Sequence, residues 1–209
     1  MIKWMATPFL CSSFLFLLAC GSNKTNSKTL EQEVAQANTQ KTISQSYRVE
    51  TIAQFNEPWA ITSLPDQRLL ITERKGQLKL FDPKTKSIVN VSAVPAVSYG
   101  GQGGLGDVIL HPDFQNNHWL YLSYASKGQD GYGAEISRAK LDLSNPAQPK
   151  LTDLKTIWKQ VPKVSGQGHY GHRMLFGSDG KLWVSSGERQ KFDPAQDMQS
   201  NLGKILRLN

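Results

Sequence analysis

The chain has 209 residues, with 24 lysines and arginines against 17 aspartates and glutamates, so its formal net charge of +7 is modest. The basic residues are spread through turn segments without interleaved aromatic residues, which speaks against a nucleic-acid-binding protein. The only cysteines are Cys11 and Cys20, and Cys11 would be removed with a signal peptide, so we expect neither a disulfide nor a thiolate metal site.

Residues 1–19 are predicted to form a signal peptide. Lys3 precedes the apolar run Phe9–Ala19, which is too short to span a bilayer. The run leads into Leu-Leu-Ala-Cys at positions 17–20, which resembles a bacterial lipobox, with Cys20 as the lipidated first residue. An ordinary signal peptide with an incidental cysteine is the alternative. We expect an exported bacterial protein, anchored by its lipid at the periplasmic or outer-membrane face.

Residues 20–46 are predicted to be a disordered tether. They are rich in Ser, Thr, Asn, Gln and Lys and contain almost no large apolar residues. Such a segment cannot bury enough surface to offset the entropy that ordering costs. We therefore expect the folded domain to occupy residues 47–209.

From Tyr47 onward the sequence predicts an all-β domain. Short runs of β-branched, aromatic and leucine residues alternate with Gly, Pro, Asp and Asn, and no stretch keeps a helical apolar period. The predicted strands are Trp59–Leu64, Leu69–Glu73, Gln77–Phe81, Val108–Leu110, Trp119–Tyr124, Glu135–Leu143, Lys155–Val161, Lys181–Ser186 and Ile205–Leu208.

One unit recurs three times along this domain: a strand, a turn with an aspartate, a second strand, a variable gap and a third strand. The turn aspartates are Asp66, Asp113 and Asp179, and spacings of 47 and 66 residues suit propeller blades with inserted loops. Residues 47–209 would supply about three to three and a half blades, whereas closed propellers typically have about four to eight. The sequence thus predicts an incomplete propeller, either a fragment or a truncated product.

Gly101–Gly106 has the glycine spacing of a dinucleotide-binding loop, but its surroundings do not fit. That loop requires a following helix, whereas Asp107–Pro112 is β-like and broken by proline. Nor does an acidic residue lie about twenty positions further on, where Ser126 and Lys127 stand. We interpret the segment as a glycine-rich connection between blades whose backbone lines the propeller mouth.

Gly166–Arg173 places two histidines in a glycine-rich loop before a predicted strand. Because glycines let the backbone approach a ligand closely, His169 is a candidate functional residue, with a structural role as the alternative. A metal site formed by His169 and His172 is disfavoured. Residues three apart point to opposite faces of a strand, and Gly171 argues against a helix.

Taken in order, these segments resemble the soluble, pyrroloquinoline quinone (PQQ)-dependent aldose sugar dehydrogenases of the glucose/sorbosone dehydrogenase family. His169–Met174 is similar to the His-Phe-Gly-Gly-Arg-Leu segment of that family. The resemblance implies a six-bladed propeller of the quinoprotein glucose dehydrogenase type, of which the chain holds about three blades. It also implies oxidation of aldoses to lactones with PQQ and calcium. The other matching segments are Pro58–Ala60, Thr72–Arg74, Gly101–Leu105, His111–Phe114, Asp179–Leu182, Ser186–Glu188, Ala195–Asp197 and Leu202–Leu208.

The same resemblance implies roles for three residues. His169 matches the base that takes the proton from the anomeric hydroxyl while hydride passes to the quinone, and neutral imidazole suits this task. Glu188 matches the carboxylate that orients the histidine, and Gln102 matches a glutamine that contacts substrate at the cofactor mouth. Gly168 replaces a substrate-contacting aspartate of the glucose dehydrogenases, which implies a broader aldose-accepting site. His172 replaces a glycine, with no assigned effect.

In the family, the calcium site and the basic residues that hold the quinone lie beyond the region that residue 209 reaches. We therefore do not expect the 209 residues alone to be active. The alternative function is a non-catalytic surface β-propeller lipoprotein that binds a carbohydrate or a protein partner. Basic and calcium-ligating residues in a downstream reading frame would favour the enzyme.

Overall fold

The computed structural model describes residues 47–209, so the predicted signal peptide, Cys20 and the predicted tether lie outside the described residues. Residues 50–209 form the unit that carries every strand described below. Within the described part of the chain, no helix is long and apolar enough to cross a membrane.

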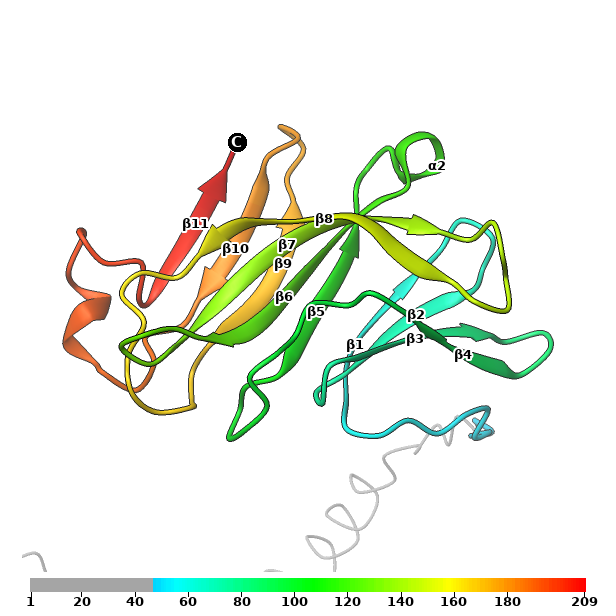
Figure 1. Cartoon of the computed structure of the whole chain (residues 1–209), viewed down its shortest axis with the longest axis horizontal. Coiled ribbons are helices and arrows are strands. Elements are labelled where there is room, and N and C mark those ends of the chain that lie inside the picture. Colours follow the sequence, from blue (N-terminus) through cyan, green and yellow to red (C-terminus); the bar gives the residue numbers. More distant parts are fainter. Residues whose placement is uncertain (1–46) are drawn as a thin grey trace, which may run out of the picture. The chain divides into compact units, whose positions relative to one another are not determined.

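The strands form three antiparallel sheets, in each of which every strand pairs with its neighbour in sequence (Figure 1). We call these sheets the first, second and third blade, because they follow one another along the chain as propeller blades do. The first blade is β1 (Pro58–Ser63), β2 (Leu69–Glu73), β3 (Gln77–Asp82) and β4 (Ser87–Val91). The second is β5 (Leu105–Leu110), β6 (Trp119–Lys127), β7 (Tyr132–Asp142) and β8 (Lys150–Lys159). The third is β9 (Gly171–Phe176), β10 (Leu182–Ser186) and β11 (Lys204–Leu208).

This arrangement confirms the prediction of an all-β domain with about three blades. All nine predicted strands overlap observed ones, and four elements are additional: β4, α2, β9 and the short 3-10 helix η1 (Asp193–Ala195). The edge strand β4 is not predicted from the sequence, because only Val91 among its residues is buried and the apolar pattern is weak. The helix α2 (Phe114–Asn117) is too short to show a helical apolar period.

The blades pack face to face through their first strands, with β5 lying against β1 on one side and β9 on the other. Strand alternation supplies the apolar residues that fill the two interfaces. Leu70, Leu78 and Leu122 belong to the core cluster between the first and second blades, and Met174 and Val184 to the one between the second and third. Each fully buried side chain of this size contributes about 1.5–3 kcal/mol.

Buried polar contacts fix neighbouring blades relative to one another. The Asp107 carboxylate on β5 accepts a hydrogen bond of 2.9 Å from the backbone N–H of Met174 on β9. The Ser123 hydroxyl donates to the carbonyl of His172 at 2.8 Å, and the Thr72 hydroxyl donates to the carbonyl of Gly106 at 2.7 Å. Since β9 directly follows the loop of His169, these contacts give that loop a rigid end.

Candidate functional site

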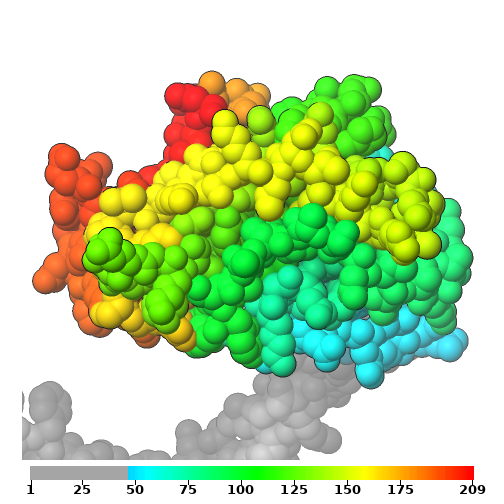
Figure 2. Space-filling model, viewed as in Figure 1, coloured from blue at the N-terminus to red at the C-terminus, as the bar shows by residue number. Residues whose placement is uncertain are grey.

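The candidate site lies where three loops meet at one edge of the blades: the loop into β5, the loop into β9 and the loop after β10. The backbone N–H of Gln102 donates to the carbonyl of Gln167 at 2.8 Å, and that of Gly187 donates to the carbonyl of Tyr170 at 3.0 Å. The loop after β10 continues into a segment that projects to one side of the unit, drawn in orange (Figure 2). Residues far apart in sequence are thus brought together.

His169 and Glu188 form a hydrogen-bonded pair through His169 Nδ1 and Glu188 Oε1. The imidazole is about half exposed, at 47%, while the carboxylate is 23% exposed. The second oxygen, Oε2, accepts the backbone N–H groups of Lys191 at 2.7 Å and Phe192 at 3.1 Å. The hydrogen bond from His169, with smaller contributions from these N–H groups, holds the pKa of the Glu188 carboxyl below its usual range.

This geometry selects one form of the imidazole. Because an ionised Glu188 can only accept hydrogen bonds, Nδ1 must carry the proton that joins the pair. In the neutral ring the lone pair then resides on Nε2, which has no hydrogen-bond partner among the described residues. The arrangement therefore offers a neutral base at Nε2, oriented by a carboxylate that is hydrogen-bonded to Nδ1.

Gln102 lies next to the backbone of His169, and its amide oxygen already accepts a hydrogen bond. Its Oε1 accepts the backbone N–H of His169 at 2.8 Å. Its Nε2 group has no hydrogen-bond partner among the described residues and remains free to donate. Gln102 thus combines the positioning of His169 with one free donor at the site.

The loop residues around the pair adopt a backbone conformation that L-residues rarely take. The φ angles are 47° at His169, 61° at Arg189, 58° at Gln190 and 59° at Phe192. Such residues cost on the order of 1–3 kcal/mol each and cluster at functional sites. The Glu188 carboxylate holds the turn by accepting the two N–H groups at its far end.

Arg189, which the sequence did not indicate as a functional residue, holds the His169 loop through hydrogen bonds to its backbone. Its side chain is 1% exposed and its guanidinium donates to the carbonyls of Gly166 and Gly168 at 2.7 Å each, and to that of Tyr132. The guanidinium also lies 3.7 Å from the centre of the Tyr170 ring. Burial lowers the pKa of Arg189 from its usual value, but a guanidinium stays charged.

His172 lies apart from the His169–Glu188 pair, in the wall between the first strands. Its ring stacks on Tyr170 at 5.4 Å and meets the edge of Trp59 at 5.8 Å. Neither ring nitrogen has a hydrogen-bond partner among residues 47–209. Burial, together with the charge of Arg189, lowers the pKa of His172 to about 3, so the ring is neutral. Among these residues no group of three or more His, Cys, Asp and Glu could hold a metal ion.

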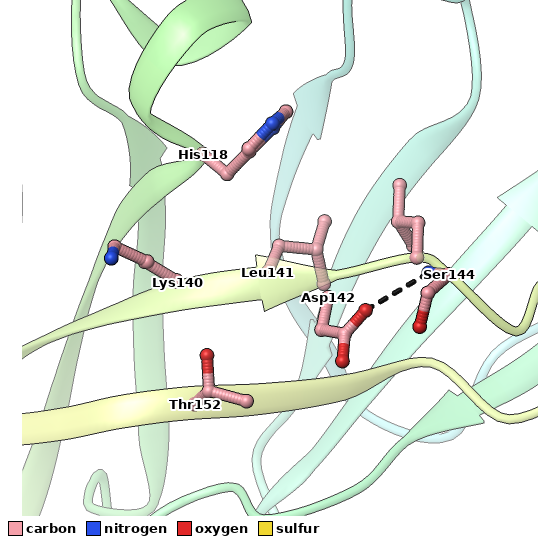
Figure 3. A pocket seen from close by; sticks show the side chains of 7 residues that line it. His118, Lys140, Leu141, Asp142, Ser144 and Thr152 are labelled. Atoms are coloured by element: carbon pink, nitrogen blue, oxygen red, sulfur yellow. Dashed lines mark hydrogen bonds between the residues drawn. The ribbon is translucent and has the colours of Figure 1, made fainter.

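A pocket of about 440 Å³ lies elsewhere, beside β7 and β8, and contains none of the three candidate residues (Figure 3). The charged side chains that line it already have partners. Lys140 pairs with Asp153 at 3.1 Å, and Asp142 accepts the backbone N–H of Ser144 at 2.9 Å. This pocket is a groove in the second blade, separate from the His169–Glu188 pair.

Comparison with known proteins gives consistent matches. The sequence model of the family described as glucose/sorbosone dehydrogenase matches residues 55–209. The aldose sugar dehydrogenase YliI of Escherichia coli (strain K12) is 39% identical over 158 residues, which cover 74% of this chain and 41% of the relative. Quinoprotein glucose dehydrogenase B of Acinetobacter calcoaceticus is 28% identical, over 76% of this chain and 38% of the relative. The chain therefore spans less than half the length of these relatives.

Solved structures agree with this result. The apo-form of the soluble aldose sugar dehydrogenase from Escherichia coli matches with a TM-score of 0.68 and 37% identity, over 74% of this chain and 44% of that one. The PQQ-bound form of the aldose sugar dehydrogenase from Streptomyces coelicolor matches with a TM-score of 0.68 and 32% identity, over 77% and 47%.

Proposed function

Because the chain belongs to the glucose/sorbosone dehydrogenase family, we propose that its protein oxidises aldose sugars to lactones with PQQ and calcium, and that His169 is the general base. The observation that carries this proposal is the His169–Glu188 pair, which leaves Nε2 of a neutral imidazole free. The non-catalytic alternative is not favoured, since the similar proteins named above are sugar dehydrogenases.

The residues of this chain would act on the proton of the anomeric hydroxyl. His169 Nε2 accepts that proton as the carbon–hydrogen bond at the anomeric carbon breaks. The imidazolium that forms is stabilised by the ionised Glu188, whose pKa is lowered by its hydrogen bond with His169. A positioned general base of this kind typically contributes about 10²- to 10⁴-fold in rate.

The described residues fit the reacting edge of a quinone cofactor. When bound, PQQ supplies the carbonyl carbon that accepts the hydride. Gln102 Nε2 is a free donor beside the base and would hold a carbonyl or hydroxyl oxygen there. Calcium is proposed from the family resemblance alone.

The test of His169 uses the complete gene product, reconstituted with PQQ and calcium, and measures turnover of an aldose per bound quinone. We expect His169→Gln to lower turnover by about 10²- to 10⁴-fold and to change quinone affinity little. His118→Gln, in the remote pocket of the second blade, is the matched control and should retain turnover. Near wild-type turnover in His169→Gln would refute the assignment.

We also propose export and lipid anchoring through Cys20, from the lipobox-like segment at 17–20. Cys20 lies outside the described residues. The expected outcome is that Cys20→Ser abolishes labelling by a fatty-acid analogue and releases the protein from the membrane fraction. Retention of both in the variant would contradict this proposal.

A further inference from the structure

Gln190 occupies the space into which a side chain at position 168 would project. A Cβ atom built on Gly168 would lie 2.6 Å from Cδ and 3.1 Å from Nε2 of Gln190. The distance to Cδ, and the still shorter one to Oε1, leave no room for a real Cβ atom, so the amide of Gln190 packs directly against Gly168. Because Gly168 immediately precedes His169, this amide lies beside the backbone segment that carries the base.

The backbone of Gln190 is positioned by the two residues that precede it. Arg189 is buried and donates to the carbonyl of Gly168 at 2.7 Å, and one residue earlier Glu188 is paired with His169. Gln190 itself is exposed, has a φ of 58° and makes no hydrogen bond within the described residues. Strained residues cluster at functional sites, and the amide of Gln190 has no protein partner among the described residues that would compete with a ligand.

The two amides of Gln102 and Gln190 are both adjacent to His169. Gln102 contacts its backbone N–H at 2.8 Å, and Gln190 covers the preceding residue. A hydroxyl whose proton His169 accepts would therefore lie close to both amides. An amide that donates and accepts can bind a neighbouring sugar hydroxyl whichever way that hydroxyl points.

We propose that Gln190 determines sugar specificity by hydrogen-bonding the hydroxyl on the carbon next to the anomeric carbon. This inference rests on the proposed function, because it takes the anomeric hydroxyl to be at His169. It assigns the amide of Gln190, which has no partner of its own, to the substrate. Sugars that lack the adjacent hydroxyl are then poorer substrates, since the amide loses its partner.

The experiment compares kcat/KM for D-glucose and 2-deoxy-D-glucose in the complete, PQQ- and calcium-loaded protein. Wild type should prefer glucose, and Gln190→Ala should reduce that preference by about 3- to 10-fold, the range for one exposed hydrogen bond. Gln148→Ala, at an exposed glutamine in the loop between β7 and β8, should leave the preference unchanged. An unchanged preference in Gln190→Ala, with wild type active, would overturn this inference alone.

A second variant distinguishes a substrate contact from a general effect on the loop. In Gly168→Ala the new methyl group must displace the Gln190 amide, so this variant should lose the preference as Gln190→Ala does. The double variant should lose no more than either single one, because both act through one contact. Additive losses would overturn the proposal. Absence of aldose turnover in the wild type would overturn both this inference and the proposed function.

Discussion

Glu188 offers two carboxylate oxygens, and the structure gives each a different partner. Oε1 accepts from His169, while Oε2 accepts two backbone N–H groups that cannot turn away. A glutamine at this position must keep its single oxygen toward the two N–H groups, so its NH₂ group would face His169 Nδ1. That contact favours the tautomer with the proton on Nε2, in which the base has no free lone pair.

We therefore expect Glu188→Gln to lower turnover per bound quinone nearly as much as His169→Gln, by about 10²-fold or more. Lys191→Ala is the control, because it keeps both backbone donors to Glu188 and should stay close to wild type. Steady-state kinetics on the reconstituted protein measure the turnover of both variants. A loss of less than a few-fold in Glu188→Gln would show that the tautomer does not limit catalysis.

The sequence could indicate His169, Glu188 and Gln102 as a set because each belongs to a recognisable segment. It could not show that Gln102 Oε1 accepts the backbone N–H of His169, because 67 positions separate the two. Arg189 and Gln190 could not be predicted from the sequence for a similar reason. Arg189 donates to a carbonyl of the loop before His169, and Gln190 packs against Gly168 in the same loop. Both contacts join residues some twenty positions apart.

At the scale of elements, the sequence predicted strands best where one face is buried. β2 is predicted with its observed bounds because Leu70 and its neighbours are almost wholly buried. β8 was placed too late, since its first half alternates weakly and much of it is exposed. The sequence also left the effect of His172 open, because what surrounds its ring depends on how β9 packs against the other first strands.

The packing of β9 makes stability depend on pH through His172. Its folded-state pKa of about 3 lies below the usual value of 6.5, because burial disfavours the charged ring. Below pH 6.5 the His172 ring becomes protonated in the unfolded chain but stays neutral in the folded protein. The contribution to stability is therefore present above that pH and is lost as the pH falls, by up to about 1.4 kcal/mol per unit.

The test replaces His172 with phenylalanine, which keeps an aromatic ring between Tyr170 and Trp59 and removes two unpartnered nitrogens. We expect the unfolding free energy of wild type, relative to His172→Phe, to decline between pH 6 and pH 4. Any backbone strain at this position, where φ is 78°, does not vary with pH. Urea unfolding at several pH values measures the difference, and a constant difference would contradict a neutral, buried His172.

At the scale of the molecule, family membership confirms the resemblance drawn from the motifs, and the described sheets form part of a propeller. The blade count followed from the spacing of the turn aspartates, but the sequence could not show which faces remain open. The third blade buries Met174 and Val184 toward the second blade. Its other face exposes Leu175 at 67% and Trp183 at 37%, which are paired across β9 and β10.

An apolar sheet face of this kind is expected to lie against a further blade in the complete protein. Leu175→Lys should then lower the unfolding free energy of the complete gene product by about 2 kcal/mol or more, through the lost apolar burial and a buried charge. Leu154→Lys is the matched control, because Leu154 is 42% exposed on β8 of the second blade, which already has a sheet on both sides. That variant should stay within about 0.5 kcal/mol of wild type. Equal, small effects of both substitutions would mean that the outer face of the third blade meets solvent rather than another blade.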